Sequence, residues 1–294
     1  MLRRISAGIV VIGAVLVLAG PVVLAADEGQ PIAHTEAHPK GFTLTYDVYT
    51  GGLRAIRLDL SVAFSPADQA DPAPAASYET RINMETSGLI GALFNLRFDA
   101  NSVGAWQGGN IVPERYHTAN VWRGNAREVS IDYVDGVARK VSAVPPYSAE
   151  DMKKVDPAMI PGAIDPTSAV TSLVLTSALE GRCRPQTAIY DGRRRYDAKL
   201  ETLEAEILKP SSAAPFAGKA EGCKLSFKRI AGFKPDKKRL QDFEVDIWQA
   251  DIGVEDGRVP VRLELSTPWG NGFAHLIRAR AADGALVFGK ADRD

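Results

Sequence analysis

Hydrophobic and polar residues alternate along most of the chain, in short runs separated by turn residues. In the first clear run, Leu44, Tyr46 and Val48 alternate with threonine and aspartate. A strand that buries one face and exposes the other gives this period of two. Similar runs recur almost to the end of the chain, with Gly-Gly or Asp-Gly between several of them. The alternation therefore predicts antiparallel strands joined by hairpins.

Residues 164–181 break the alternation and have the spacing of a helix. Asp165 can cap the N-terminus, because its carboxylate accepts from N–H groups of the first turn, and Pro166 suits the first helical position. Gly181 is a suitable stop, since glycine enters the left-handed conformation without penalty. Apolar residues recur at spacings of three and four, namely Ala169, Val170, Leu173, Val174 and Ala178. So short a helix is marginal alone, and we expect its apolar face to be buried.

Together these elements predict a mainly β fold. We expect a single curled antiparallel sheet, or an open or spiral β-barrel, with one main helix packed against the concave side. About eleven or twelve strand-like runs occur, and no linker clearly separates two domains. A sheet of this size must curl, close or be covered to manage its edges. The sequence therefore predicts a single β-rich domain over residues 41–294.

The N-terminus has the three parts of a secretory signal peptide. Two early arginines precede an apolar run over residues 5–24, and Ala25 ends a small-residue cleavage site. A retained membrane anchor is the alternative, because the run is just long enough to span a bilayer. We expect residues 1–25 to be the signal peptide, residues 26–40 a flexible tail, and the protein to reside in the periplasm.

Composition and charge restrict the partners. The chain has 35 basic and 36 acidic residues, and loss of the leader with its two arginines leaves 33 basic residues. This balance excludes a nucleic-acid-binding protein, which needs a clustered basic surface and a high pI. No segment after the leader could span a membrane as a helix.

The chain has two cysteines, Cys183 and Cys223. In an oxidising compartment such a pair usually forms a disulfide. Closing a loop of about 40 residues stabilises the fold by about 4 kcal/mol in the chain-entropy model. A redox or metal pair is the alternative, but the cysteines are far apart and lack a CxxC motif. We therefore predict a disulfide.

The sharpest hairpin signal is Asp191-Gly192, within the run IYDGRRRYD. If these two residues form the turn, Tyr190 pairs with Arg193. Arg194 then lies on an apolar face and needs an acid or a carbonyl partner, or must reach water. The candidate functional cluster consists of Asp191, Arg193, Arg194, Arg195, Tyr196 and Asp197. In the structural alternative, Asp191 serves the turn and the arginines lie on a solvated face.

No motif of a known catalytic, metal or cofactor site occurs. The chain lacks HExxH, GxSxG, SxxK, a Walker loop and a dinucleotide fingerprint. Carboxylate pairs such as Asp191 with Asp197, or Glu204 with Glu206, could in principle serve acid–base catalysis. We nevertheless expect no catalytic residue, no cofactor and no metal, and a protein that is not an enzyme.

Five segments resemble the family called domain of unknown function 3108. They are Tyr46–Arg57, Ile164–Ser168, Ile189–Asp197, Ile230–Phe233 and Pro260–Thr267. The resemblance covers most of the mature chain, and the YDGRRRYD run is fairly specific. It implies an exported protein of a Gram-negative bacterium and no particular reaction. The expected architecture is also similar to that of the lipoprotein carriers of the periplasm, which is an analogy of fold alone.

These observations lead to three functional hypotheses. The first is a non-enzymatic periplasmic protein whose concave side holds an apolar ligand, a lipid acyl chain or a partner segment, in cell-envelope maintenance. The second is an interaction or structural protein that docks another envelope protein through the sheet, with its interior filled by side chains. The third is a hydrolase of unrecognised type that uses carboxylates near Asp191 and Asp197. Whether the helix fills the hollow of the sheet distinguishes the first two.

Overall fold

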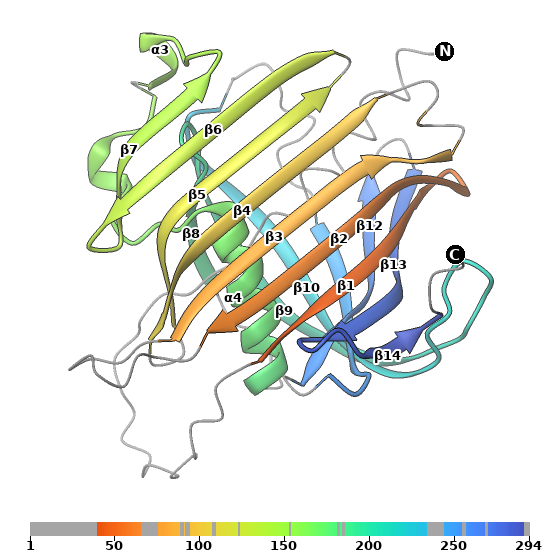
Figure 1. The fold of residues 1–294 in the computed structure, drawn as a ribbon. Coiled ribbons are helices and arrows are strands. Elements are labelled where there is room, and N and C mark those ends of the chain that lie inside the picture. The colour runs from red at the N-terminus through yellow and green to blue at the C-terminus, as the bar shows by residue number, and fades with distance from the viewer. Residues whose placement is uncertain are drawn as a thin grey trace.

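The computed structural model describes residues 40–65, 76–88, 91, 95–107, 110–122, 124–152, 154–180, 183, 186–233, 244–254, 257–267 and 270–290. The expected signal peptide and the tail up to residue 39 lie outside these ranges. The described chain is mainly β, and its antiparallel strands form one continuous open sheet around one main helix (Figure 1). The expected fold class is therefore confirmed.

Fourteen strands are described. They are β1 (Gly41–Thr50), β2 (Leu53–Ser65), β3 (Ala76–Thr86), β4 (Leu96–Gln107), β5 (Asn110–Trp122), β6 (Asn125–Val134), β7 (Val137–Val144), β8 (Gln186–Tyr190), β9 (Arg195–Leu208), β10 (Gly218–Ala231), β11 (Glu244–Asp251), β12 (Arg258–Thr267), β13 (Gly270–Ala281) and β14 (Leu286–Gly289). The sequence does not predict β14, because four residues carry too little alternation. The connection between β7 and the main helix contains two short elements, α3 (Ala149–Met152) and the 3-10 turn η1 (Pro157–Met159).

The first strand lies in the middle of the sheet. The strand order runs β7-β6-β5-β4-β3-β2-β1-β13-β12-β11-β10-β9-β8, and β14 pairs with β13 outside this path. Consecutive strands therefore pair with each other except for β7 and β8, which lie at the two ends of the sheet, and β1 also pairs with β13. In Figure 1 the strands from β1 to β7 form one wall and those from β8 to β13 form a second wall behind it. The main helix lies between the two walls.

The main helix, α4 (Pro166–Glu180), begins where the sequence predicts, with Asp165 as its cap. The Asp165 carboxylate accepts from the backbone N–H of Ser168 at 2.9 Å. Gly181 and the side chain of Ala178 lie outside what the structure describes. The expected burial of the apolar face is confirmed for Ala169, Val170, Leu173 and Val174. Polar side chains of the helix are buried as well, namely Thr167, Ser168, Thr171 and Ser172. A helix enclosed by two walls buries its whole circumference, and its polar side chains then need partners inside the protein.

The hairpin between β8 and β9 differs from the predicted one. Tyr190 pairs with Arg195 and not with Arg193, so the turn has four residues, 191–194. The Asp191 carboxylate accepts from the backbone N–H groups of Arg193 at 3.0 Å and Arg194 at 2.7 Å. This side-chain capping holds a wider turn than the two-residue type that Asp-Gly favours. The shift of two residues leaves the faces of β9 as expected but places Arg194 in the turn.

The predicted disulfide between Cys183 and Cys223 is confirmed, with 5.9 Å between the two Cα atoms. Cys183 follows the end of α4, and Cys223 is a buried residue of β10. The bond therefore attaches the C-terminal end of the helix to the second wall.

Candidate functional site

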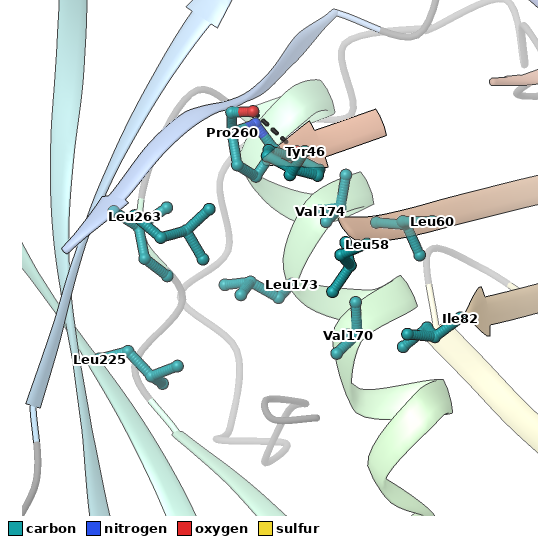
Figure 2. Close-up of a pocket in the computed structure, with 11 residues that line it drawn as sticks. Tyr46, Leu58, Leu60, Ile82, Val170, Leu173, Val174, Leu225, Pro260 and Leu263 are labelled. Atoms are coloured by element: carbon teal, nitrogen blue, oxygen red, sulfur yellow. Dashed lines mark hydrogen bonds between the residues drawn. The ribbon is translucent and has the colours of Figure 1, made fainter. Parts of the chain in front are cut away.

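A small apolar cavity of about 40 Å³ lies beside α4, between the two walls (Figure 2). Its lining is apolar except for one phenol group, and consists of Tyr46, Leu58, Leu60, Ile82, Val170, Leu173, Val174, Leu225, Ile247, Pro260 and Leu263. Figure 2 shows Leu58 and Ile82 on one side of the helix and Leu225 and Leu263 on the other. The cavity therefore lies where the helix meets both walls.

The phenol of Tyr46 does not present a polar group to the cavity. Its hydroxyl donates to the carbonyl oxygen of Pro260 at 2.7 Å, joining β1 to β12. Burial raises the pKa of Tyr46 well above its ordinary value, so the group stays neutral and hydrogen-bonded. What remains facing the cavity is aromatic and aliphatic carbon.

The cavity volume decides how much the hollow can hold. Pockets for drug-sized ligands have volumes of about 300–1,000 Å³, far above the 40 Å³ found here. The helix residues facing it are themselves nearly inaccessible, with Leu173 at 7% and Val174 at 2% exposure. The helix thus nearly fills the hollow. A chain of many methylene groups would fit only if the helix and the second wall moved apart.

Hydrogen bonds attach α4 to the first wall. The Ser168 hydroxyl bonds with the Tyr78 hydroxyl at 2.7 Å, and Thr171 bonds with Thr80 at 2.7 Å. Both strand residues belong to β3, and all four side chains are buried. The sequence analysis missed this contact. The signal was the repeated Thr-Ser pair four residues apart in the helix, which places hydroxyls on one face.

Asp165 is the charged member of this polar network. It has no exposed surface, and its carboxylate accepts from the hydroxyls of Ser102 at 3.0 Å and Ser168 at 2.5 Å. Burial raises the pKa of Asp165 to about 6, while the hydrogen bonds from Ser168 and Ser102 act in the opposite direction. The carboxyl group therefore joins α4 to β4 and titrates close to neutral pH.

The predicted functional cluster divides into two parts in the structure. The first part is at the turn, where Arg194 pairs with Asp191 at 2.6 Å. The sequence left open an acid, a carbonyl group or water as the partner of Arg194, and the structure shows an acid. The Asp191 carboxylate raises the pKa of Arg194. Tyr196 lies nearby, with its ring edge-on to that of Phe233 at 6.2 Å between centroids.

The second part is on the opposite face of β9, where Arg195 pairs with Asp197 at 2.5 Å. The Arg195 guanidinium also donates to the carbonyl oxygen of Met159 at 3.2 Å. Asp191 and Asp197 thus each have an arginine of their own. The other carboxylate pair, Glu204 and Glu206, lies on exposed positions of β9.

Arg193 contacts an aromatic residue that the sequence analysis did not consider. Its guanidinium lies over the ring of Tyr147 at 5.5 Å, and Arg127 lies over the same ring at 5.3 Å. Arg194 and Arg229 share the ring of Phe233 in the same manner, at 5.7 and 4.7 Å. Four arginines therefore contact two aromatic rings around the turn.

The described residues contain no group of three or more His, Cys, Asp or Glu side chains placed to hold a metal ion. None of the helices in the described ranges is long and apolar enough to cross a membrane.

The fold and the site define the class of protein: an open, barrel-like antiparallel sheet wrapped around a buried helix. The family model described as "Protein of unknown function (DUF3108)" matches residues 45–277, so the chain belongs to this family. Among solved structures, the chain is similar to a beta-barrel-like protein of domain of unknown function DUF1849 from Brucella abortus. The identity is 9% and the TM-score 0.44, over 82% of this chain and 97% of that one. No curated protein matches the chain.

Proposed function

We propose that this protein is a non-enzymatic component of the periplasm that takes up an apolar group, such as a lipid acyl chain, in cell-envelope maintenance. The observation that carries the proposal is the apolar cavity between α4 and the two walls. An apolar group that enters the cavity is removed from water, which is favourable. Its entry breaks no hydrogen bond of the cavity lining, so no buried polar group loses its partner.

The attachment of α4 favours the second wall as the place of entry. Near its start the helix is hydrogen-bonded to β3 and β4 through Ser168, Thr171 and its cap Asp165. The second wall meets the helix through apolar side chains that line the cavity, such as Leu225 and Leu263. Parting these apolar surfaces exposes them to water, at about 25 cal/mol per Å², and a ligand that covers them again offsets this cost. While the helix and the second wall separate, the disulfide keeps the C-terminal end of the helix attached to β10.

The proposal is tested with a fluorescent fatty acid, cis-parinaric acid, added to protein purified without detergent. We expect saturable binding by the natural protein. Leu173→Phe fills the cavity and should weaken binding about tenfold or more, because overpacking costs about 1–3 kcal/mol. Ile207→Phe is the matched control, since Ile207 is 71% exposed on β9.

Thermal unfolding of both variants checks that they remain folded. Equal binding by the natural protein and both folded variants, or no binding by any, would contradict the proposal. Mass spectrometry of the purified natural protein gives an independent result, in which we expect a co-purified lipid.

A second candidate function is docking of another envelope protein through the sheet. It is favoured by the nearly filled interior and by β7, the last strand at one end of the sheet, where Val144 is 64% exposed. An end strand can pair with a strand of a partner. A photo-crosslinking residue at position 144 should then trap a protein in the periplasm, and one at position 207 should not.

A further inference from the structure

The two walls are joined differently on the two sides of α4. On one side β1 pairs with β13 along residues 42–50. On the other side lie the end strands β7 and β8, at the left in Figure 1, and the described residues form no ladder between them. We call the line where the β8–β9 turn, residues 191–194, meets β6 and β7 the seam. Parting the walls at the seam leaves every strand pairing intact, whereas parting β1 from β13 would leave buried backbone groups without partners.

The β8–β9 turn closes the seam by packing on apolar side chains of the first wall. A Cβ atom on Gly192 would lie 3.1 Å from side-chain carbons of Val129 and Val141, and 3.7 Å from Ile131. Val129 and Ile131 are buried. If the turn moved away, these side chains would come into contact with water. The seam therefore covers part of the apolar interior.

The ring of Tyr147 contacts an arginine from each wall. Arg127 of β6 lies over the ring at 5.3 Å, and Arg193 of the turn lies over it at 5.5 Å. Arg127 also donates to the carbonyl oxygen of Pro145 at 3.3 Å, which holds the chain before the ring on the first wall. Without the ring, two positive charges would face the seam without the aromatic group that attracts both. Tyr147 thus holds the turn to the first wall.

The connection from β7 to α4, which carries this ring, crosses from one wall to the other. Its end is fixed to the second wall, because the Ile164 N–H donates to Ala188 at 3.0 Å and the Tyr190 N–H donates to Ile164 at 2.9 Å. Between its two ends, α3 and η1 coil the chain. A coiled residue advances about 1.5–2 Å and an extended one about 3.3 Å, so the connection can lengthen while both ends stay fixed.

We propose that the seam is the gate through which an apolar group enters the interior, and that Tyr147 keeps it closed. The gate opens when the β8–β9 turn moves away from β6 and β7, while β1 and β13 stay paired. The entry of a ligand rests on the proposed function, whereas the opening of the seam does not. The two are therefore measured separately.

The opening is measured by alkylation of a buried thiol with N-ethylmaleimide. Ile131→Cys places the thiol behind the seam, and Leu276→Cys, on β13 where it pairs with β1, is the matched control. Both positions have 0% exposure, and the natural cysteines are joined in a disulfide. We expect position 131 to react at least tenfold faster than position 276, because a local opening exposes the first and only a larger unfolding exposes the second.

Replacement of the ring tests its role. Tyr147→Ala should speed alkylation at position 131 about tenfold, since contacts with two arginines are lost, and should leave position 276 within twofold. Tyr147→Phe keeps the ring and should leave both rates within twofold of the natural ones. Thermal unfolding identifies the variants that remain folded. In these, equal rates at the two positions, or a rate at position 131 that does not respond to Tyr147→Ala, would overturn the gate.

Entry is measured by the rate at which cis-parinaric acid binds in a stopped-flow instrument. Tyr147→Ala should speed binding about tenfold and Tyr147→Phe should not. Binding at an unchanged rate, in a variant whose position 131 is alkylated faster, would overturn the seam as the entrance. Absence of binding by the natural protein would contradict the proposed function and with it the entrance, and the alkylation rates would still show whether the seam opens.

Discussion

At the scale of single residues, Asp165 has the most unusual surroundings. It is a fully buried carboxylate whose hydrogen-bond donors are the Ser102 and Ser168 hydroxyls and the Ser168 backbone N–H. These bonds favour the charged form, but burial disfavours it more strongly, and the pKa rises to about 6. Folding therefore favours the protonated form of Asp165. Its contribution to stability depends on pH in the direction opposite to that of a salt-bridged aspartate.

We expect the free energy of unfolding to fall as the pH rises from about 4 to about 6, by up to about 3 kcal/mol from this group, and to level off above. In that range the folded protein binds more protons at Asp165 than the unfolded chain does. Asp165→Asn should remove the fall while keeping the helix cap, since asparagine also caps. Urea unfolding at several pH values measures this.

Asp156→Asn is the matched control, because Asp156 caps the short turn η1 from an exposed position. Its pH profile should follow that of the natural protein. Parallel profiles for Asp165→Asn and the natural protein would contradict the assignment.

Gly192 allows a second test at this scale. Its φ of 90° and that of Gly51, 57°, both favour glycine, but a Cβ atom would meet valine side chains at Gly192 and nothing within 4 Å at Gly51. Gly192→Ala should therefore cost about 1 kcal/mol more than Gly51→Ala, because only the first adds a crowding term to the backbone strain. Denaturant unfolding of both variants gives the difference, and equal losses would contradict the tight packing of the turn.

At the scale of elements, what the sequence predicts depends on how local the cause is. The start of α4 is predictable, because Asp165 and Pro166 act on the residues beside them. The β8–β9 register is not, because the Asp191 side chain widens a turn that its neighbours suggest is tight. The aromatic partners of the arginines, Tyr147 and Phe233, come from distant segments that alternation cannot bring together. The hydrogen bonds between α4 and the first wall were not predicted, because a helix that is buried on all sides also places polar side chains inside the protein.

The disulfide acts on an element, since it holds the end of α4 against β10. Replacing both Cys183 and Cys223 by serine should lower the free energy of unfolding by up to about 4 kcal/mol, the entropy of closing a loop of about 40 residues. Urea unfolding of the natural protein with dithiothreitol should give the same stability as the double variant. A natural protein whose stability does not respond to the reductant would contradict a stabilising bond.

At the scale of the whole molecule, one sheet of antiparallel strands encloses one helix, and the pairing of β1 with β13 makes the two walls continuous. Neither wall covers α4 alone, because the helix residues are buried between both. We expect a chain shortened to end after β9 to lack a cooperative unfolding transition and to be digested by trypsin within minutes, whereas the full chain resists. Protection of the shortened chain would show that the first wall and α4 suffice.

The bond between the Tyr46 hydroxyl and Pro260 joins residues 214 positions apart. On a ribosome or at a translocation channel, the N-terminal strand must therefore wait for almost the entire polypeptide before its second neighbour emerges. Contacts between residues so distant in sequence form slowly, because the chain loses the conformational entropy of a long loop before the contact can stabilise the fold. Until then the apolar core residues are exposed and can contact other unfolded chains. Folding of this protein in the cell should therefore depend on a chaperone that binds these exposed residues.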